Sequence, residues 1–255
     1  MKTGTVLQGI QKKIRDGCGC YWILLDPDDF SDKEAAALAA QACKAGVDAI
    51  LVGGSILRTN HLDSFVLSVK NAAGIPVILF PGDATQISPA ADAILFLSLV
   101  SGRNPMNLIG EQVKGAPLIK DYGIEPIATA YMLVESGAVT SVEFMSNTRP
   151  LPRSKPMIAA AHALAAQYMG MSLIYLEAGS GALHTVPNEM VRMVRDYVDI
   201  PVIVGGGIRD AATAAEKIDA GAHIIVTGNL LHKENGLDVM KKIAKVVKKK
   251  KKQRC

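Results

Sequence analysis

Short apolar runs recur along the chain, and most of them are followed by a stretch with helical periodicity. The runs mostly do not alternate between apolar and polar residues, which is typical of strands buried on both faces of a parallel sheet. The expected strands are 21–25, 47–52, 76–80, 93–97, 124–134, 172–176, 201–204 and 223–226. Eight strand–helix units in a chain of 255 residues predict an α/β fold, a (β/α)8 or TIM barrel, with an open doubly wound sheet as the alternative.

Two connections depart from this alternation. Only residues 81–92 separate the third and fourth expected strands, and Pro81, Gly82 and Pro89 leave no room there for a full crossover helix. We therefore expect a short extended segment in place of the third helix, with an open groove on that side. Residues 137–154 are polar and show no clear helical pattern, which favours a flap or an oligomer contact.

The composition, 49% hydrophobic and 20% charged, is that of an ordinary globular protein, and no apolar run reaches the roughly 18 residues of a membrane span. The first residues lack the apolar block of a signal peptide, so a cytoplasmic protein is expected. We expect residues 1–240 to form a single barrel domain, and residues 241–255 to form a lysine-rich helix end and tail.

The formal net charge of +4 comes from this tail. Residues 241–255 hold nine lysines or arginines and no acid, whereas residues 1–240 carry 19 basic and 24 acidic side chains. A mildly acidic body argues against nucleic-acid binding. The tail is expected to be a solvated end, and peripheral contact with an anionic membrane surface is the alternative.

Cysteine and histidine spacing argues against several kinds of site. The single residue between Cys18 and Cys20 is not the spacing of a zinc or redox pair, and with Cys43 and Cys255 the cysteines are too few for a disulfide framework. The five histidines show no metal-ligand spacing, and the chain has neither a nucleophile elbow nor a P-loop. We therefore expect neither a hydrolase nor a P-loop enzyme.

The stretch 172–182, SLIYLEAGSGA, places an acid where a buried strand ends. Glu177 is followed by Gly179 and Gly181, which allow backbone N–H groups to approach a ligand. This pattern indicates either a binding site or a plain turn with a solvated Glu177.

Two later strands also end in glycine-rich loops. The sequence VGGGIRD at 204–210 ends the seventh expected strand, and VTGN at 226–229 ends the eighth. Barrels often hold a phosphate between these two loops, where glycines and the N-terminus of the next helix offer N–H groups. A phosphate site is therefore favoured over two unrelated tight turns.

Asp26 and Ser55 stand at the ends of the first and second expected strands. Mg²⁺ is usually held by one or two carboxylates together with substrate phosphate oxygens, so this pair would suit a metal that binds with substrate. The alternative is an Asx turn at Asp26.

Together these motifs resemble the geranylgeranylglyceryl phosphate synthase family, in particular its second group, which is related to the bacterial heptaprenylglyceryl phosphate synthases. The resemblance spans roughly residues 20–235, and YLEAGSG is its most specific motif. The motifs are LLDPDD at 24–29, VGGS at 52–55, LFPG at 79–82, YLEAGSGA at 175–182, VGGGIRD at 204–210 and VTGN at 226–229. The family's fold is a barrel with an extended segment in place of the third helix, in agreement with the short third connection.

The resemblance implies a prenyltransferase that joins sn-glycerol 1-phosphate to geranylgeranyl diphosphate, or a similar prenyl diphosphate, through an ether bond and releases diphosphate. It implies that Glu177 is the general base and that Asp26 and Ser55 bind Mg²⁺. It also implies a homo-oligomer, either a dimer or a hexamer. The residues implied to bind glycerol and phosphate are Tyr175, Leu176, Glu177, Ala178, Gly179, Ser180, Gly181, Gly206, Gly207, Gly228 and Asn229.

The chain departs from the family at the diphosphate. Many members carry Lys directly after DPD, where this chain has Asp29, and another subgroup has Lys where this chain has Leu24. The cation for diphosphate must then come from elsewhere, and Arg58, Arg103 and Lys120 are candidates. The prenyl chain length stays open, with residues 97–100 and Tyr131 as candidate determinants.

Two other functions stay open from the residues alone. One is an isomerase or synthase that acts on a phosphorylated sugar or a thiamine-type precursor and needs no prenyl groove. The other is a non-catalytic barrel that binds a phosphorylated metabolite. Acids at two strand ends, Asp26 and Glu177, argue against the second, because both would repel a phosphate.

Overall fold

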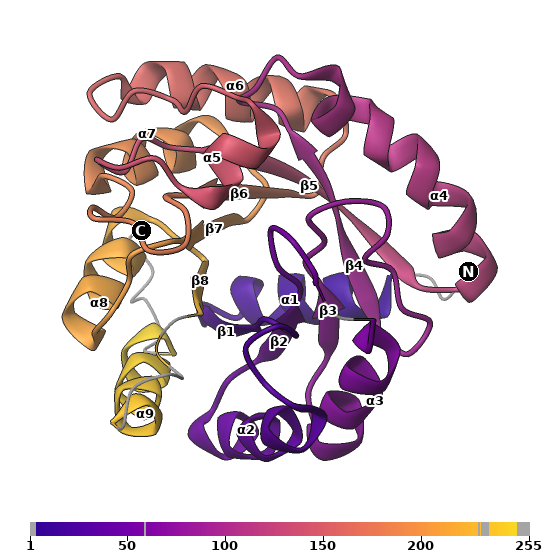
Figure 1. Cartoon of the computed structure of the whole chain (residues 1–255). Helices are drawn as coiled ribbons and strands as arrows, with labels where there is room; N and C mark the ends of the chain where they lie inside the picture. The colour runs from indigo at the N-terminus through magenta and orange to yellow at the C-terminus, as the bar shows by residue number, and fades with distance from the viewer. Residues whose placement is uncertain (1–3, 59, 229, 231–234, 249–255) are drawn as a thin grey trace.

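Eight parallel strands close into one barrel in the order of the sequence, and the last strand pairs with the first (Figure 1). The computed structural model describes residues 4–58, 60–228, 230 and 235–248. The strands are β1 (Cys20–Leu25), β2 (Ala49–Val52), β3 (Val77–Leu79), β4 (Ala93–Leu99), β5 (Glu125–Leu133), β6 (Leu173–Glu177), β7 (Val202–Gly205) and β8 (Ile224–Thr227). The predicted TIM barrel is confirmed, and the pairing of β8 with β1 rules out an open sheet.

Helices surround the strands, as Figure 1 shows. Their ends carry ordinary local signals: Ser31 and Glu34 form a reciprocal capping box at the start of α2, and Gly46 ends this helix in the left-handed conformation. The helices are α1 (Thr5–Arg15), α2 (Asp32–Ala45), α3 (Leu62–Ala72), the π-helix η1 (Met106–Gly110), α4 (Glu111–Tyr122), α5 (Ser141–Ser146), α6 (Pro156–Tyr168), α7 (Asn188–Tyr197), α8 (Ala211–Ala220) and α9 (Gly236–Val247).

The core has two layers, because successive strand residues point to opposite faces. One layer packs the outer faces of the strands against the helices, and the other fills the barrel with side chains such as Trp22, Leu51 and Leu95. Helix α1 closes the amino-terminal end of the barrel, where its Ile10 joins the inner layer. The buried Glu125 carboxylate accepts hydrogen bonds from the first turn of α1 and so holds this helix in place. The cavity described below opens at the opposite end of the barrel.

The third connection has no helix within residues 80–92, as the sequence predicts. The N–H of Ala84 donates to Glu111 Oε2 (2.9 Å) at the start of α4, and Lys70 Nζ donates to the carbonyl of Ala90 (2.9 Å). The segment is thus tied at both ends. The missing helix leaves a groove between β3, β4 and α4, which forms part of the cavity described below.

The expectation of no helix in residues 137–154 was wrong for α5. Thr140 caps this short helix and Asn147 ends it at a positive φ of 47°. Six residues are too few to produce a helical period that a sequence pattern reveals. Met145 and Ser146 of α5 line the cavity, in keeping with a flap, and the oligomer contact stays a prediction.

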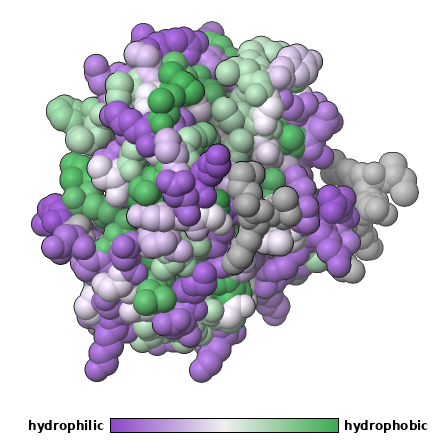
Figure 2. Space-filling model, turned by 90° about the vertical axis from the view of Figure 1, so that its right-hand side faces the viewer, coloured by the Kyte–Doolittle hydropathy of each residue, from purple (hydrophilic) through white to green (hydrophobic). Residues whose placement is uncertain are grey.

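The lysine-rich tail falls outside the described residues from Lys249 onward, so its contact with a membrane surface also stays a prediction. Within the described residues, no helix combines the length and the apolar character that crossing a membrane requires. Figure 2 shows the face that carries α4, on which hydrophobic residues lie between hydrophilic ones.

Candidate active site

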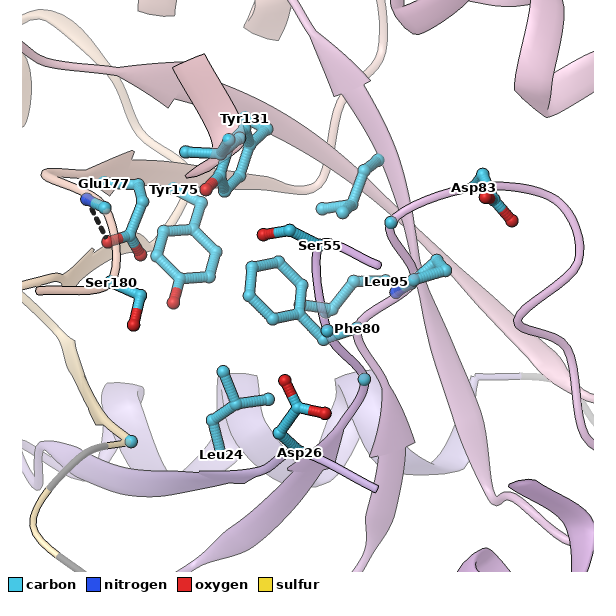
Figure 3. Close-up of a pocket in the computed structure, with 18 of the residues that line it drawn as sticks. Leu24, Asp26, Ser55, Phe80, Asp83, Leu95, Tyr131, Tyr175, Glu177 and Ser180 are labelled. Atoms are coloured by element: carbon cyan, nitrogen blue, oxygen red, sulfur yellow. Dashed lines mark hydrogen bonds between the residues drawn. The ribbon is translucent and has the colours of Figure 1, made fainter. Parts of the chain in front are cut away.

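A cavity of about 620 Å³ opens at the carboxyl ends of the strands, and it has two chemically different halves. The polar half consists of Glu177 and the glycine loops 179–181, 206–207 and residue 228. The apolar half lies in the groove left by the missing third helix and is lined by Ile87, Ile94, Leu95, Leu97, Gly115 and Ile119. Figure 3 shows Tyr175 and Phe80 between the two halves, with Glu177 on one side and Leu95 on the other.

Glu177 is the last residue of β6 and is only 6% exposed. Its Oε1 accepts a hydrogen bond from the N–H of Gly179 (2.6 Å, Figure 3), and the phenol of Tyr175 also donates to the carboxylate. Burial raises the pKa of Glu177 to about 7, although these hydrogen bonds lower it. A carboxyl group with this pKa can accept a proton near neutral pH.

The loop after β7 packs directly against this carboxylate, and only glycine fits there. A Cβ on Gly205 would lie 2.6 Å from Glu177 Oε2 and 2.7 Å from the Tyr175 hydroxyl. Gly206 has a φ of +81°, and a Cβ there would collide with Glu177 Oε1 and lie 2.7 Å from the Gly179 nitrogen. The predicted phosphate loop and the predicted base therefore form one packed unit.

The predicted phosphate site rests on loop amides more than on the helix that follows. Asp210 caps α8, because its Oδ1 accepts the N–H of Thr213 (2.7 Å), so an acid already occupies that helix N-terminus. The N–H groups of Gly206 and Gly207 donate to no other described residue. These two amides are thus the donors that a phosphate would meet.

Asp26 follows β1 and lines the cavity. Its Oδ1 accepts the N–H of Asp28 (3.0 Å), which is the predicted Asx turn, yet the carboxylate still faces the cavity (Figure 3). Burial raises the pKa of Asp26, and the charges of Asp29 and Asp28 add to this, whereas the Asp28 N–H and Arg58 oppose it. A cation beside Asp26 would relieve this crowding of negative charge.

Ser55 lies in the loop after β2 and is exposed on the same side of the cavity. The buried Gln86 holds this loop: its Nε2 donates to the carbonyl of Gly54 (2.9 Å), and its Oε1 accepts the N–H of Gly82 (3.1 Å). Gln86 thus joins the exits of β2 and β3, and the sequence patterns did not single it out.

The cavity lining is strongly acidic for a site that is expected to take phosphates. Among the described residues that line it, Arg209 is the one lysine or arginine. The carboxylates that line it are Asp26, Asp29, Asp83, Glu111 and Glu177. This imbalance favours a divalent cation that enters with an anionic substrate.

Few protein groups are available to a metal ion among the described residues of the cavity. Within the described residues there is no group of three or more His, Cys, Asp or Glu side chains arranged to hold a metal ion. Asp26 and the Ser55 hydroxyl supply hard oxygen ligands, and substrate oxygens and water would complete a Mg²⁺ shell. This donor set fits the predicted Mg²⁺ site.

The three candidate cations for diphosphate do not line the cavity. Arg58 forms an exposed ion pair with Asp28 (3.2 Å), Arg103 donates to the carbonyl of Gly102 (2.6 Å), and Lys120 is exposed on α4. The cation that does line it, Arg209, is part of the VGGGIRD motif, so that motif could have pointed to it.

Whether the remaining residues predicted to bind glycerol and phosphate reach the cavity depends on which face of the strand they occupy. Tyr175, Ser180 and Gly228 line the cavity, whereas Leu176 and Ala178 are fully buried in the layer between strands and helices. Those two can face a ligand only through their backbone. Asn229 lies outside the described residues.

Three aromatic rings, from Phe80, Tyr131 and Tyr175, meet where the two halves join. Phe80 stacks on Tyr175 with ring centres 5.4 Å apart, and Tyr131 meets Tyr175 edge-on at the same distance. Of the residues predicted to determine prenyl chain length, Leu97, Leu99 and Tyr131 line the cavity. The arrangement combines a buried acid, glycine-rich loops and an apolar groove.

Comparison with known proteins gives the same picture. The sequence matches the PcrB family over residues 12–249. The geranylgeranylglyceryl phosphate synthase of Thermococcus gammatolerans is 46% identical over 243 residues, 95% of each chain. The protein of the same name from Chitinophaga pinensis is 46% identical over 228 residues, 89% of this chain and 90% of the relative.

Solved structures extend the likeness to three dimensions. The crystal structure of (S)-3-O-geranylgeranylglyceryl phosphate synthase from Thermoplasma acidophilum, in complex with its substrate sn-glycerol-1-phosphate, matches with a TM-score of 0.91 and 38% identity, over 96% of this chain and 98% of that one. A thiamine phosphate pyrophosphorylase from Pyrococcus furiosus, 14% identical with a TM-score of 0.58, shares the fold alone. This chain therefore belongs to the PcrB family, that of the geranylgeranylglyceryl phosphate synthases.

Proposed function

We propose that this protein is a prenyltransferase that joins sn-glycerol 1-phosphate to geranylgeranyl diphosphate. A hydroxyl oxygen of the glycerol phosphate bonds to C1 of the prenyl chain, the bond from C1 to the diphosphate breaks, and the hydroxyl proton passes to Glu177. The products are geranylgeranylglyceryl phosphate and diphosphate. Relatives that carry this enzyme name align over nearly the whole chain, which supports the proposal.

The observation that carries the proposal is the place of Glu177 in the polar half, directly beside the aromatic rings that border the apolar groove. Its carboxylate packs against the loop of Gly205 and Gly206, where the phosphate of the acceptor would bind. Through Tyr175 it adjoins Phe80 and the apolar groove, where the prenyl chain would lie. A base that must act between a phosphorylated alcohol and a lipid belongs at this junction.

Asp26 and Ser55 would hold Mg²⁺ at the end of the groove. When bound, the metal supplies positive charge to the leaving diphosphate. The cavity lining supports this assignment, because one arginine cannot neutralise a diphosphate beside several carboxylates.

The aromatic rings would protect the reacting carbon. An allylic carbon becomes positively charged as its bond to diphosphate breaks, and aromatic faces attract cations. Phe80, Tyr131 and Tyr175 offer such faces and exclude water that would compete with the glycerol hydroxyl.

The two other functions left open by the sequence fit this cavity less well. A phosphorylated sugar or thiamine-type precursor would leave the apolar half between β4 and α4 without a role. A non-catalytic binder of phosphorylated metabolites would not need a buried carboxylate of raised pKa beside its phosphate loop.

A product assay tests the proposal. The full chain is incubated with labelled sn-glycerol 1-phosphate, Mg²⁺ and, in separate reactions, farnesyl, geranylgeranyl or heptaprenyl diphosphate. Label should pass to the organic phase, most with geranylgeranyl diphosphate, and should not do so with EDTA or with sn-glycerol 3-phosphate. A folded protein that transfers label from none of the three donors would overturn the proposal.

The variant Asp26→Asn tests the metal site in the same assay. We expect transfer to fall about 100-fold or more, because the charge that holds Mg²⁺ is lost. Calorimetric affinity for sn-glycerol 1-phosphate alone should stay within about twofold, since Asp26 lies at the other side of the cavity. Unchanged Mg²⁺ dependence in this variant would show that the metal, if used, binds elsewhere.

A further inference from the structure

Three cationic side chains converge on one short stretch of backbone that follows the predicted substrate loop. The stretch is loop 182–186, between β6 and α7, and each cation comes from a different part of the chain. The bonds run from Arg209 Nη2 to the carbonyl of Ala182 (3.0 Å), from Arg153 Nη1 to that of Thr185 (2.8 Å) and from Lys217 Nζ to that of Val186 (2.7 Å). No step of the proposed reaction uses these contacts.

Lys217 is the most informative of the three, because it is buried and only 3% exposed. Its Nζ makes a second bond to Asn188 Oδ1 (2.6 Å), so both acceptors are neutral oxygens. Burial lowers the pKa of Lys217, and the Arg153 charge lowers it further, whereas Glu216 raises it. Burying an amine is costly, so this residue is poorly explained as a source of stability.

The position of Lys217 relative to α7 also argues against a purely stabilising role. Its Nζ lies at the N-terminus of that helix, since Val186 and Asn188 flank the N-cap residue Pro187. A helix N-terminus disfavours a cation. The favourable partners of Lys217 are therefore the Val186 carbonyl of loop 182–186 and Asn188 Oδ1.

Loop 182–186 in turn supports both parts of the polar half. A Cβ on Gly207 would lie 3.3 Å from Thr185 Cγ2 and 3.5 Å from the Ala182 carbonyl oxygen, so the loop directly backs the phosphate loop. The N–H of Ala182 donates to the carbonyl of Gly179 (3.3 Å), and the N–H of Gly179 donates to Glu177. A continuous set of contacts thus runs from the cations to the base.

We propose that Arg153, Lys217 and Arg209 form a clamp that fixes loop 182–186 and thereby positions the binding site for the phosphorylated acceptor. Lys217 is a positioning residue in this scheme, and it touches neither substrate. The identity of the acceptor rests on the proposed function, whereas the ordering of the loop does not. The clamp acts on the polar half and leaves the apolar groove unchanged.

The variant Lys217→Met tests the clamp, with Lys70→Met as the matched control. Lys70 also donates to a backbone carbonyl, that of Ala90 (2.9 Å), but in the segment before β4. We expect the backbone amides of residues 178–186 to exchange with solvent about tenfold faster in Lys217→Met and at the wild-type rate in Lys70→Met. The KM for sn-glycerol 1-phosphate should rise about tenfold, with the KM for geranylgeranyl diphosphate within about twofold of wild type.

The two measurements separate the clamp from the proposed function. Wild-type exchange rates at residues 178–186 in folded Lys217→Met would overturn the clamp, whether or not the protein transfers prenyl groups. Faster exchange with an equal rise in both KM values would overturn its selective action on the acceptor. If Lys217→Met does not fold, Arg153→Met, which removes a half-buried clamp residue, undergoes the same tests. Absence of prenyl transfer in the wild type would contradict the identity of the acceptor, but it would not contradict the ordering of loop 182–186 by the clamp.

Discussion

The two halves of the cavity are built in opposite ways. The polar half comes from the ends of neighbouring strands, where glycine backbone packs against the Glu177 carboxylate with no room for a side chain. The apolar half exists because a helix is missing, and it is lined by side chains from β4, α4 and the segment that replaces the helix. We therefore expect the proposed acceptor site to tolerate little change, whereas the groove should be able to change size without loss of the proposed reaction.

Acidic side chains lie on both sides of the cavity. Glu177 carries its raised pKa because it is buried in the polar half, and Asp26 lies across the cavity with other acids. Variants of Glu177, of the glycine loops or of Asp26 should therefore lose the reaction, whereas variants of the apolar residues in the groove should only change the preferred prenyl donor.

Glu177→Gln should cause the largest loss of activity. Without a base, kcat should fall about 1,000-fold, although the amide keeps an oxygen that can accept the Gly179 N–H. In the wild type, kcat/KM should rise with pH and level off above about 7, because Glu177 must lose its proton to act. Near-normal turnover of the variant, with the same pH profile, would show that another group is the base.

Glu177→Gln, which should lose activity, should also remove a pH-dependent loss of stability. The pKa of Glu177 rises from its ordinary value near 4.5 to about 7 on folding, so the native state binds more protons than the unfolded state between these values. The wild type should thus lose stability as pH rises from about 4.5 to about 7, by up to about 3 kcal/mol. Glu177→Gln should not show this loss, and denaturant unfolding at pH 5 and pH 8 measures the difference.

Gly206→Ala should have a smaller but selective effect. Its φ of +81° strains any side chain, and the new Cβ would press on Glu177 and on the Gly179 nitrogen. We expect the KM for sn-glycerol 1-phosphate to rise about 10- to 100-fold. Gly123→Ala is the control, since its φ is also positive, at +66°, but nothing lies within 4 Å of the new Cβ. An unchanged KM in Gly206→Ala would contradict this prediction, and an equal rise in Gly123→Ala would mean that the rise is not specific to the loop packed against Glu177.

The sequence predicts the polar half much better than the apolar half, for a physical reason. Strand ends and glycine loops are contiguous motifs, so Glu177 and Gly206 could be assigned together once a barrel was inferred. The period of two along a strand also decides that Tyr175 and Glu177 face inward while Leu176 faces outward, a distinction that the motif alone did not make.

Contacts between distant residues account for what the sequence did not predict. The groove was expected from the short third connection, but no local pattern pairs Ile87 with Gly115 of α4. Likewise Lys217 meets Val186 across 31 residues, and Gln86 meets Gly54 across 32. Such pairs appear only when the barrel closes and brings successive units together.

Gly115→Val should have the smallest effect, and it tests whether the apolar half can change independently of the polar half. A Cβ on Gly115 would lie 3.1 Å from Ile87 Cδ1, so a valine there narrows the apolar groove. The preference for geranylgeranyl over farnesyl diphosphate, measured as a ratio of kcat/KM values, should fall about tenfold, because the longer chain needs the narrowed part. The KM for sn-glycerol 1-phosphate should not change, and Ala116→Val, exposed on the same helix, controls for the effect of valine on α4. An unchanged donor ratio, or a rise in the acceptor KM, would mean that the two halves are not independent in the way their construction indicates.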